Sequence, residues 1–346
     1  MQKYKYAGIY IILMLLSVVM TKCNCHHSGS GKKGSDTTTV QNLNNPQIKE
    51  YTDKIADDPN VAENYYFRSS VYMTLKNYKS AYKDLLSATT IDSTNPKYFA
   101  AMGIACIKGN FIPGALDPLN KSLKLDPSNE AIRLSLAQSY FYLRDYQSSL
   151  NQLHILLDQD KKFYQAFFFE GMNFKELGDT TKAISSFQEA VQIKPDYYEA
   201  YMQLGLLSSA KKSKLAPQYF DDAIRLDTTG SEAYYGKGKY YQDVKDDPMA
   251  KKVYRELVQK DPFNEHAFFN LGFIYLMEDS IKEAYKYFNF SIKVKPQYAE
   301  GYYYRGLCEN LLGNKVQALG DIDEAIALKP DFEEAKETYN KLQKQK

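Results

Sequence analysis

The chain has 346 residues, of which 44% are hydrophobic and 25% are charged, as in an average soluble protein. This composition excludes wholesale disorder, a collagen-like fibre and a protein with many membrane spans. The 44 basic and 42 acidic residues give a formal net charge of +2, so the charge predicts no nucleic-acid partner. Four cysteines are too few for a small scaffold held together by disulfides. The 31 Tyr and 18 Phe residues must fill either a core or a binding face.

The first 22 residues have the order of an export signal. Lys3 and Lys5 precede an apolar run over residues 7–20. At a rise of ~1.5 Å per residue this run would extend only ~21 Å as a helix, against a hydrocarbon core of ~30 Å. The segment is therefore better suited to export than to spanning a membrane, and we predict an export signal over residues 1–22.

Cys23 directly follows this signal. A cysteine just past an apolar run resembles the lipid-modified cysteine of bacterial lipoproteins, although Met20 and Lys22 depart from that family's preferred residues. The resemblance implies lipidation at Cys23 and an exported, membrane-anchored protein of the bacterial cell envelope, facing the periplasm or the surface. The alternatives are a soluble exported protein and an uncleaved signal anchor.

Residues 23–46 are predicted to form a flexible tether. From Ser28 onwards the segment consists mainly of Gly, Ser, Lys, Thr and Asn, which offer almost nothing to bury. Cys25, His26 and His27 lie near Cys23 in a pattern that resembles metal ligands. A short polar tail without a core cannot fix a tetrahedral site, so we predict no metal there.

A repeat of 34 residues accounts for most of the remaining chain. It begins at Ala62, and its eight copies end at Phe332. The copy that begins at Tyr198 has 33 residues, because the stretch 211–214 has lost one. The copies span residues 62–95, 96–129, 130–163, 164–197, 198–230, 231–264, 265–298 and 299–332.

Two slots in every copy hold a small residue. Small residues let two helices approach more closely than the usual ~8–10 Å between axes, so these slots predict the crossing points of a helix pair. Large apolar residues recur four, seven or eight places apart between them, the spacing of one helix face. The small residues are Ser69, Gly103, Ala137, Gly171, Gly205, Gly238, Gly272 and Gly306 in the first half, and Ala81, Ala115, Ser149, Ala183, Ala216, Ala250, Ala284 and Ala318 in the second.

The pattern resembles the tetratricopeptide repeat. That family places aromatic residues at the fourth, eleventh and twenty-fourth positions, Leu-Gly at the seventh and eighth, Ala at the twentieth and twenty-seventh, and Pro at the thirty-second. The copy at Glu130 departs most, with Arg133 in the first aromatic slot and Lys161 in place of Pro. The copy at Glu265 matches with Phe268, Leu271, Gly272, Tyr275, Ala284, Phe288 and Pro296, and departs only at Ser291.

The resemblance implies an all-α fold, in which eight antiparallel helix pairs stack into a right-handed superhelical solenoid over residues 47–346. The first helix of each pair would line a concave groove. Because a repeat stack exposes an apolar face at each end, we expect capping helices at residues 47–57 and 333–344.

The groove is the predicted binding site. In the family geometry the second, fifth, ninth, twelfth and thirteenth residues of each copy face it, and here those slots hold mainly apolar and aromatic residues, including Leu206. Some of them could instead pack between neighbouring repeats, but contiguous apolar surface of this kind usually marks a partner site. The candidate binding residues are Tyr66, Phe141, Tyr142, Phe168, Met172, Met202, Tyr235, Phe269, Phe273 and Tyr303.

The expected function is a non-catalytic scaffold that binds an extended or helical segment of another envelope protein. The alternative is an accessory subunit that captures another ligand, such as an envelope polysaccharide, on the same surface. That alternative requires polar side chains to converge beside Tyr235, and the candidates are Glu199, Glu232, Gln242, Asp243 and Glu300.

The repeats contain no motif for catalysis. His154 and His266 lie four repeats apart, and no phosphate-binding glycine loop, paired carboxylates or metal-ligand spacing occurs in the repeats. We therefore predict no enzyme activity, no catalytic residues, no metal and no cofactor. His266 falls in a groove slot. Cys106 and Cys308 lie six repeats apart, so they are expected to be buried free thiols rather than a disulfide.

Overall fold

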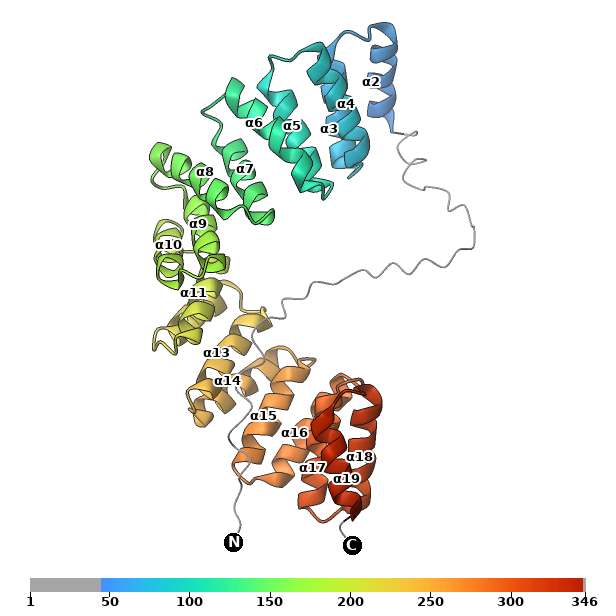
Figure 1. Cartoon of the computed structure of the whole chain (residues 1–346), viewed down its shortest axis with the longest axis vertical. Coiled ribbons are helices and arrows are strands. Elements are labelled where there is room, and N and C mark those ends of the chain that lie inside the picture. The colour runs from blue at the N-terminus through green and yellow to red at the C-terminus, as the bar shows by residue number, and fades with distance from the viewer. Residues whose placement is uncertain (1–44, 345–346) are drawn as a thin grey trace, which may run out of the picture.

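A computed structural model describes residues 45–344, and this part of the chain consists of helices joined by short turns (Figure 1). It contains eighteen α-helices, one short 3₁₀ helix and, within the described range, no strand. The predicted export signal, Cys23 and residues 23–44 of the predicted tether lie outside the described residues. No helix within residues 45–344 combines the length and the apolar character needed to cross a membrane.

Sixteen of the helices form eight antiparallel pairs, one pair in each repeat. The first helices all have 13 residues. They are α3 (Ala62–Thr74), α5 (Pro96–Lys108), α7 (Glu130–Tyr142), α9 (Tyr164–Glu176), α11 (Tyr198–Ala210), α13 (Ser231–Asp243), α15 (Glu265–Met277) and α17 (Ala299–Leu311). The second helices are α4 (Tyr78–Ile91), α6 (Leu116–Leu125), α8 (Tyr146–Gln159), α10 (Thr180–Ile193), α12 (Ala216–Leu226), α14 (Asp247–Lys260), α16 (Ile281–Val294) and α18 (Lys315–Leu328).

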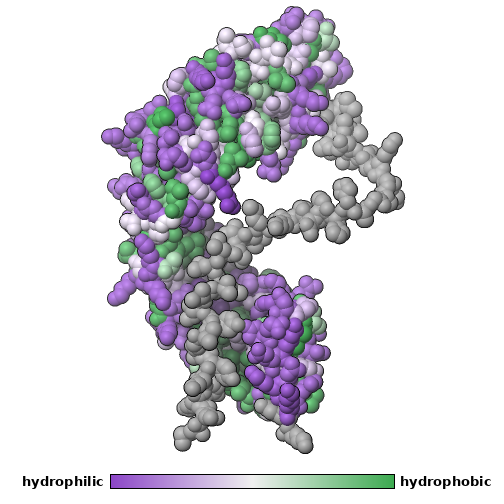
Figure 2. All heavy atoms as spheres, viewed as in Figure 1, coloured by the Kyte–Doolittle hydropathy of each residue, from purple (hydrophilic) through white to green (hydrophobic). Residues whose placement is uncertain are grey.

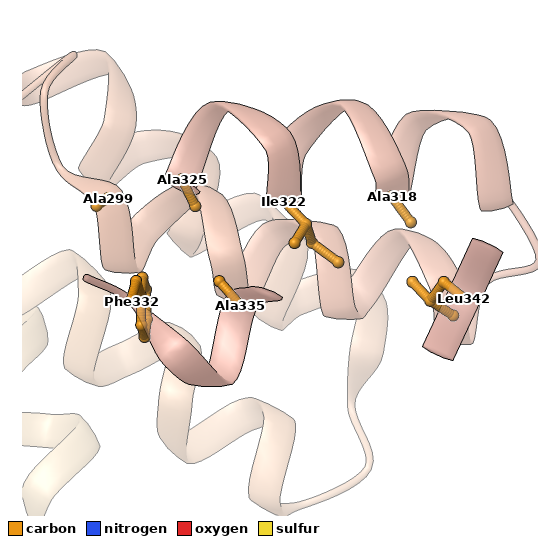
Figure 3. Packing of buried hydrophobic residues seen from close by; sticks show 7 residues of the cluster. All are labelled: Ala299, Ala318, Ile322, Ala325, Phe332, Ala335 and Leu342. Carbon is orange, nitrogen blue, oxygen red and sulfur yellow. The ribbon is translucent and has the colours of Figure 1, made fainter. Parts of the chain in front are cut away.

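One further helix covers each end of the stack. Helix α2 (Pro46–Asp57) packs on α3, and the side chain of Asn45 caps its first turn. Helix α19 (Glu333–Lys344) packs on α18. Figure 3 shows how α18 and α19 share a core, in which Ile322 lies near Ala335 and Leu342. The predicted all-α solenoid of eight helix pairs with a cap at each end is confirmed.

The small residues mark the crossing of the two helices in each repeat. A large side chain at the twenty-fourth position fills the space that the small residue at the eighth position leaves open. In the fourth copy, a Cβ added to Gly171 would lie only 2.8 Å from the ring of Phe187. Phe187 is fully buried, so the ring has no free space into which to move. The same pairing joins Gly103 to Leu119 and Gly238 to Tyr254.

A residue with positive φ makes the turn between the two helices of every repeat. Glycine fills this fifteenth position in only two copies, as Gly178 and Gly313. A side chain in this left-handed region usually costs about 1–2 kcal/mol, so the other six turns carry strain. These six positions are Lys76, Asn110, Arg144, Lys212, Lys245 and Asp279.

Two of the second helices begin late. In the second copy a 3₁₀ helix, Ile112–Ala115, replaces the first turn of α6, because Pro118 has no N–H to donate within a helix that begins at Ile112 and Gly114 has a low helix propensity. In the short copy, the turn extends over residues 211–215, and α12 begins only at Ala216. This second helix has 11 residues, and the small slot at Ala216 stays in place as its first residue.

Candidate partner-binding groove

The helix pairs stack into an open arc, shown in Figure 1. The first helices of neighbouring repeats contact one another directly, as in α5 with α7, α7 with α9, α11 with α13 and α15 with α17. Among the described residues, no two second helices make comparable contact. Elements on the inner side of a curve lie closer together than those on the outer side, so the first helices form the concave wall.

Three of the predicted rings at the fifth position pack against the aromatic residue that ends their own copy. Phe168 packs against Tyr197, with ring centroids 5.0 Å apart, and Tyr303 packs against Phe332 at the same separation. Phe269 contacts Tyr298 in the equivalent way. All three fifth-position rings are half-buried, as are Tyr66 and Tyr235. Phe269 also contacts Tyr304 of the next repeat, and Tyr66 contacts Tyr98 of the next repeat, so these rings contribute to repeat stacking and expose only part of their surface.

The predicted residues at the ninth and twelfth positions are also half-buried. Phe141 contacts Phe169 of the next repeat, and Phe273 contacts Tyr304 of the next repeat. Met172 packs on the apolar cluster around Phe187. These contacts again lie at the junctions of neighbouring repeats, so most of the predicted groove residues have a structural role.

Two of the predicted residues lie at opposite extremes of solvent exposure. The side chain of Tyr142 is 60% exposed, the most accessible of the ten candidates. Met202 is only 8% exposed, and it packs against α13 in the cluster around Phe220. Met277 is not among the predicted residues, but its side chain is 62% exposed. It occupies the thirteenth position of its copy, as Tyr142 does in the third copy.

A pocket of about 330 Å³ opens on the groove where α11, α13 and α15 meet. Met202 and Leu206 come from α11, Tyr235 from α13 and His266 from α15. Four predicted groove positions thus converge from three consecutive repeats. The complete lining is Met202, Leu206, Ser231, Glu232, Tyr235, Gly236, Asn264 and His266.

Apolar and polar groups alternate along the visible surface. Figure 2 shows hydrophobic residues at the inner edge of the arc over α5 to α7, surrounded by hydrophilic ones. The exposed apolar side chains of the first helices include Leu206, which is 47% exposed. The concave wall therefore offers separate apolar contact points rather than one continuous trough.

Buried phenols and thiols in the repeat junctions stay protonated. Burial raises the pKa of Tyr298 well above its ordinary value, and it raises that of Tyr304 to about 12. Cys106 and Cys308 are free and buried, as predicted, and burial raises the pKa of Cys308 to about 12. Such groups are poor nucleophiles at neutral pH.

His154 has a carboxylate partner that the sequence analysis did not anticipate. Its Nε2 lies 3.2 Å from Oε1 of Glu170, and the hydroxyl of Ser186 donates to Oε2 of the same carboxylate over 2.8 Å. The carboxylate lies between the histidine and the serine, so the imidazole does not contact the hydroxyl that it would have to activate. Among residues 45–344, no three His, Cys, Asp or Glu side chains are placed to hold a metal ion.

Comparisons with known proteins identify the repeats. Tetratricopeptide-repeat family models match residues 62–95 and 134–198. Human tetratricopeptide repeat protein 13 is 26% identical over 163 residues, covering 46% of this chain and 19% of its own length. A DnaJ homolog subfamily C member 7 homolog from Dictyostelium discoideum is 23% identical over 210 residues. This match covers 56% of this chain and 37% of that protein's length. The chain thus matches well under half the length of these two curated relatives.

Solved structures agree on the fold. The C-terminal part of a TPR repeat-containing protein from Cytophaga hutchinsonii superposes with a TM-score of 0.56 at 19% identity, covering 67% of this chain and 96% of that one. A tetratricopeptide repeat protein from Parabacteroides merdae gives a TM-score of 0.50 at 17% identity. The superposition covers 72% of this chain and 98% of that one. At these identities the likeness concerns the fold alone.

Proposed function

Since the chain folds as a tetratricopeptide-repeat solenoid, we propose that it is a non-catalytic scaffold that binds an extended or helical segment of another protein in its concave groove. The proposal includes location in the bacterial cell envelope, with export directed by residues 1–22 and membrane attachment through a lipid on Cys23. The partners are then proteins of the envelope.

The observation that carries the proposal is the exposure of large apolar side chains on the concave wall. Tyr142, Leu206 and Met277 belong to first helices of three different repeats, and each is at least 47% exposed. Apolar anchors of this kind contribute about 2 kcal/mol each to a protein interface, and the association itself costs at least about 4 kcal/mol. Three anchors together therefore exceed that cost only slightly, so the bound segment must contact several repeats.

The polysaccharide alternative receives less support. It requires polar side chains to converge beside Tyr235, and Glu232 does line the same pocket. Asp243, however, is paired with Lys239, and Glu300 is paired with Lys329. A protein segment that uses separate apolar contact points fits this surface better than a sugar that needs a group of convergent polar partners.

Capture of partners from the native envelope tests the proposal. A Tyr142→Ser/Leu206→Ser variant removes exposed groove side chains without opening a cavity in a repeat junction. Val316→Ser is the matched control, because Val316 is 79% exposed on the second helix α18. We expect the unmodified chain and the control to recover the same partners and the groove variant to lose them. Equal recovery by all three proteins would contradict the groove as the binding site.

A further inference from the structure

The pocket between α11, α13 and α15 combines an apolar floor with an unneutralised carboxylate. We propose that it receives a lysine or arginine side chain of the bound segment. This inference rests on the proposed function and adds to it the chemistry of the partner: a polypeptide segment with a basic residue flanked by apolar ones.

The floor and one wall of the pocket suit the carbon atoms of such a side chain. Met202 and Leu206 supply apolar surface from α11, and Tyr235 supplies an aromatic ring from α13. Long basic side chains commonly lay their methylene groups on apolar surface and keep the charged end near water or a counter-charge. A tyrosine ring also attracts a cation placed over its face. A volume of about 330 Å³ is at the lower end of small-molecule sites and suits one or two side chains.

The carboxylate of Glu232 lines the same pocket and has no ion-pair partner among the described residues. The equivalent carboxylate in the last copy, Glu300, is neutralised by Lys329, and Glu265 is neutralised by Lys295. Both lysines occupy the thirty-first position, directly after the second helix of their copy. The copies that begin at Tyr198 and Ser231 carry another residue at the equivalent position.

In the copies that begin at Tyr198 and Ser231, two of the three that form the pocket, the equivalent position is an aspartate, Asp227 in one and Asp261 in the other. Neither can neutralise a glutamate, so Glu199 and Glu232 both lack the lysine partner found in the later copies. The surroundings are electronegative as a result. Burial is the main cause of the raised pKa of Tyr198, and the carboxylates of Glu232, Asp227 and Glu199 raise it further.

The remaining polar groups of the pocket favour a cation over an anion. Asn264 uses its side chain to cap α15, and His266 lies 3.4 Å from the hydroxyl of Tyr298. No lysine or arginine is among the residues that line the pocket. A bound carboxylate would therefore find no counter-charge there, whereas a bound ammonium or guanidinium group would find Glu232. Charge complementarity of this kind gives specificity more than raw affinity.

Selection from a phage-displayed library of random dodecapeptides on the immobilised full-length chain tests the inference. We expect the selected peptides to share a lysine or arginine with apolar neighbours. Replacing that residue by norleucine in a synthetic peptide should weaken binding about tenfold, as measured by fluorescence anisotropy. Glu232→Gln should weaken the parent peptide to a similar extent and leave the norleucine peptide unaffected.

Glu324→Gln on α18 is the matched control, because it removes the same charge at an exposed position of a second helix. Equal weakening by Glu324→Gln would overturn the inference, since the effect would then reflect overall charge. Selected peptides without a shared basic residue would overturn it as well, while leaving the groove as a peptide site. Selection of no peptides at all would contradict the proposed function itself.

Discussion

Replacing Gly238 with alanine should destabilise the solenoid, although alanine is the better helix former. A Cβ at this position would lie 2.6 Å from Cε1 of Tyr254, which is fully buried. The ring cannot shift freely, because its hydroxyl donates to Gln242 and accepts from Asn270, both over 3.2 Å. Overpacking of a core costs about 1–3 kcal/mol, and the gain in helix propensity offsets only about 1 kcal/mol. We expect a net loss of up to about 2 kcal/mol.

Gly320→Ala is the matched comparison. Gly320 also lies within a helix, α18, but a Cβ there would meet no atom within 4 Å. This variant should therefore gain about 1 kcal/mol from helix propensity alone. The urea midpoints of the two full-length variants, followed by circular dichroism, should move in opposite directions from that of the unmodified chain. Stabilisation of both variants would refute the conclusion that helices α13 and α14 cross in close contact at Gly238.

Two further predictions concern a turn and the N-terminal region. Lys245 holds a positive φ of 62° and is exposed, so Lys245→Gly should stabilise the chain by about 1 kcal/mol in thermal unfolding. Lys252→Gly, at an exposed position within α14, should destabilise the chain by a similar amount. Destabilisation by Lys245→Gly together with stabilisation by Lys252→Gly would contradict the strain assigned to the turn at Lys245. Cys23→Ala should abolish incorporation of radiolabelled palmitate in bacterial cells while Cys25→Ala retains it; labelling that survives Cys23→Ala would rule out a lipid at that residue.

The register of the helices could be predicted from the sequence because each repeat specifies it locally. The pairing of a small residue such as Gly103 with a large one such as Leu119 lies within a single copy, so the spacing of two residues determines which faces meet. The same holds for the turn, where the chain must reverse after 13 helical residues. The predicted caps also follow from a local pattern, an amphipathic stretch next to the last repeat.

The exposure of the groove residues could not be predicted in the same way. Whether a ring at the fifth position faces the groove or the next repeat depends on how closely two repeats approach, and that distance is not specified within either copy. Phe269 therefore packs against Tyr304 of the next copy, and Tyr66 packs against Tyr98 of the next copy, although nothing in the spacing within either copy indicates it. Arg133 is a similar case. It is buried, and its guanidinium donates to Gln152 and to the backbone oxygen of Pro127, contacts that involve two different copies.

The site with the most specific chemistry coincides with the irregular repeat. The copy that begins at Tyr198 has lost one residue, and its second helix α12 is 11 residues long where a regular one has 14. Helices α11 and α13, on either side of it, make the most extensive contact of any two consecutive first helices in the described chain. Met202 and Leu206 of α11 lie beside Tyr235 of α13 at this contact. The pocket thus lies where two first helices approach most closely, and the aspartates at positions 227 and 261 leave Glu199 and Glu232 without the lysine partner found in the later copies.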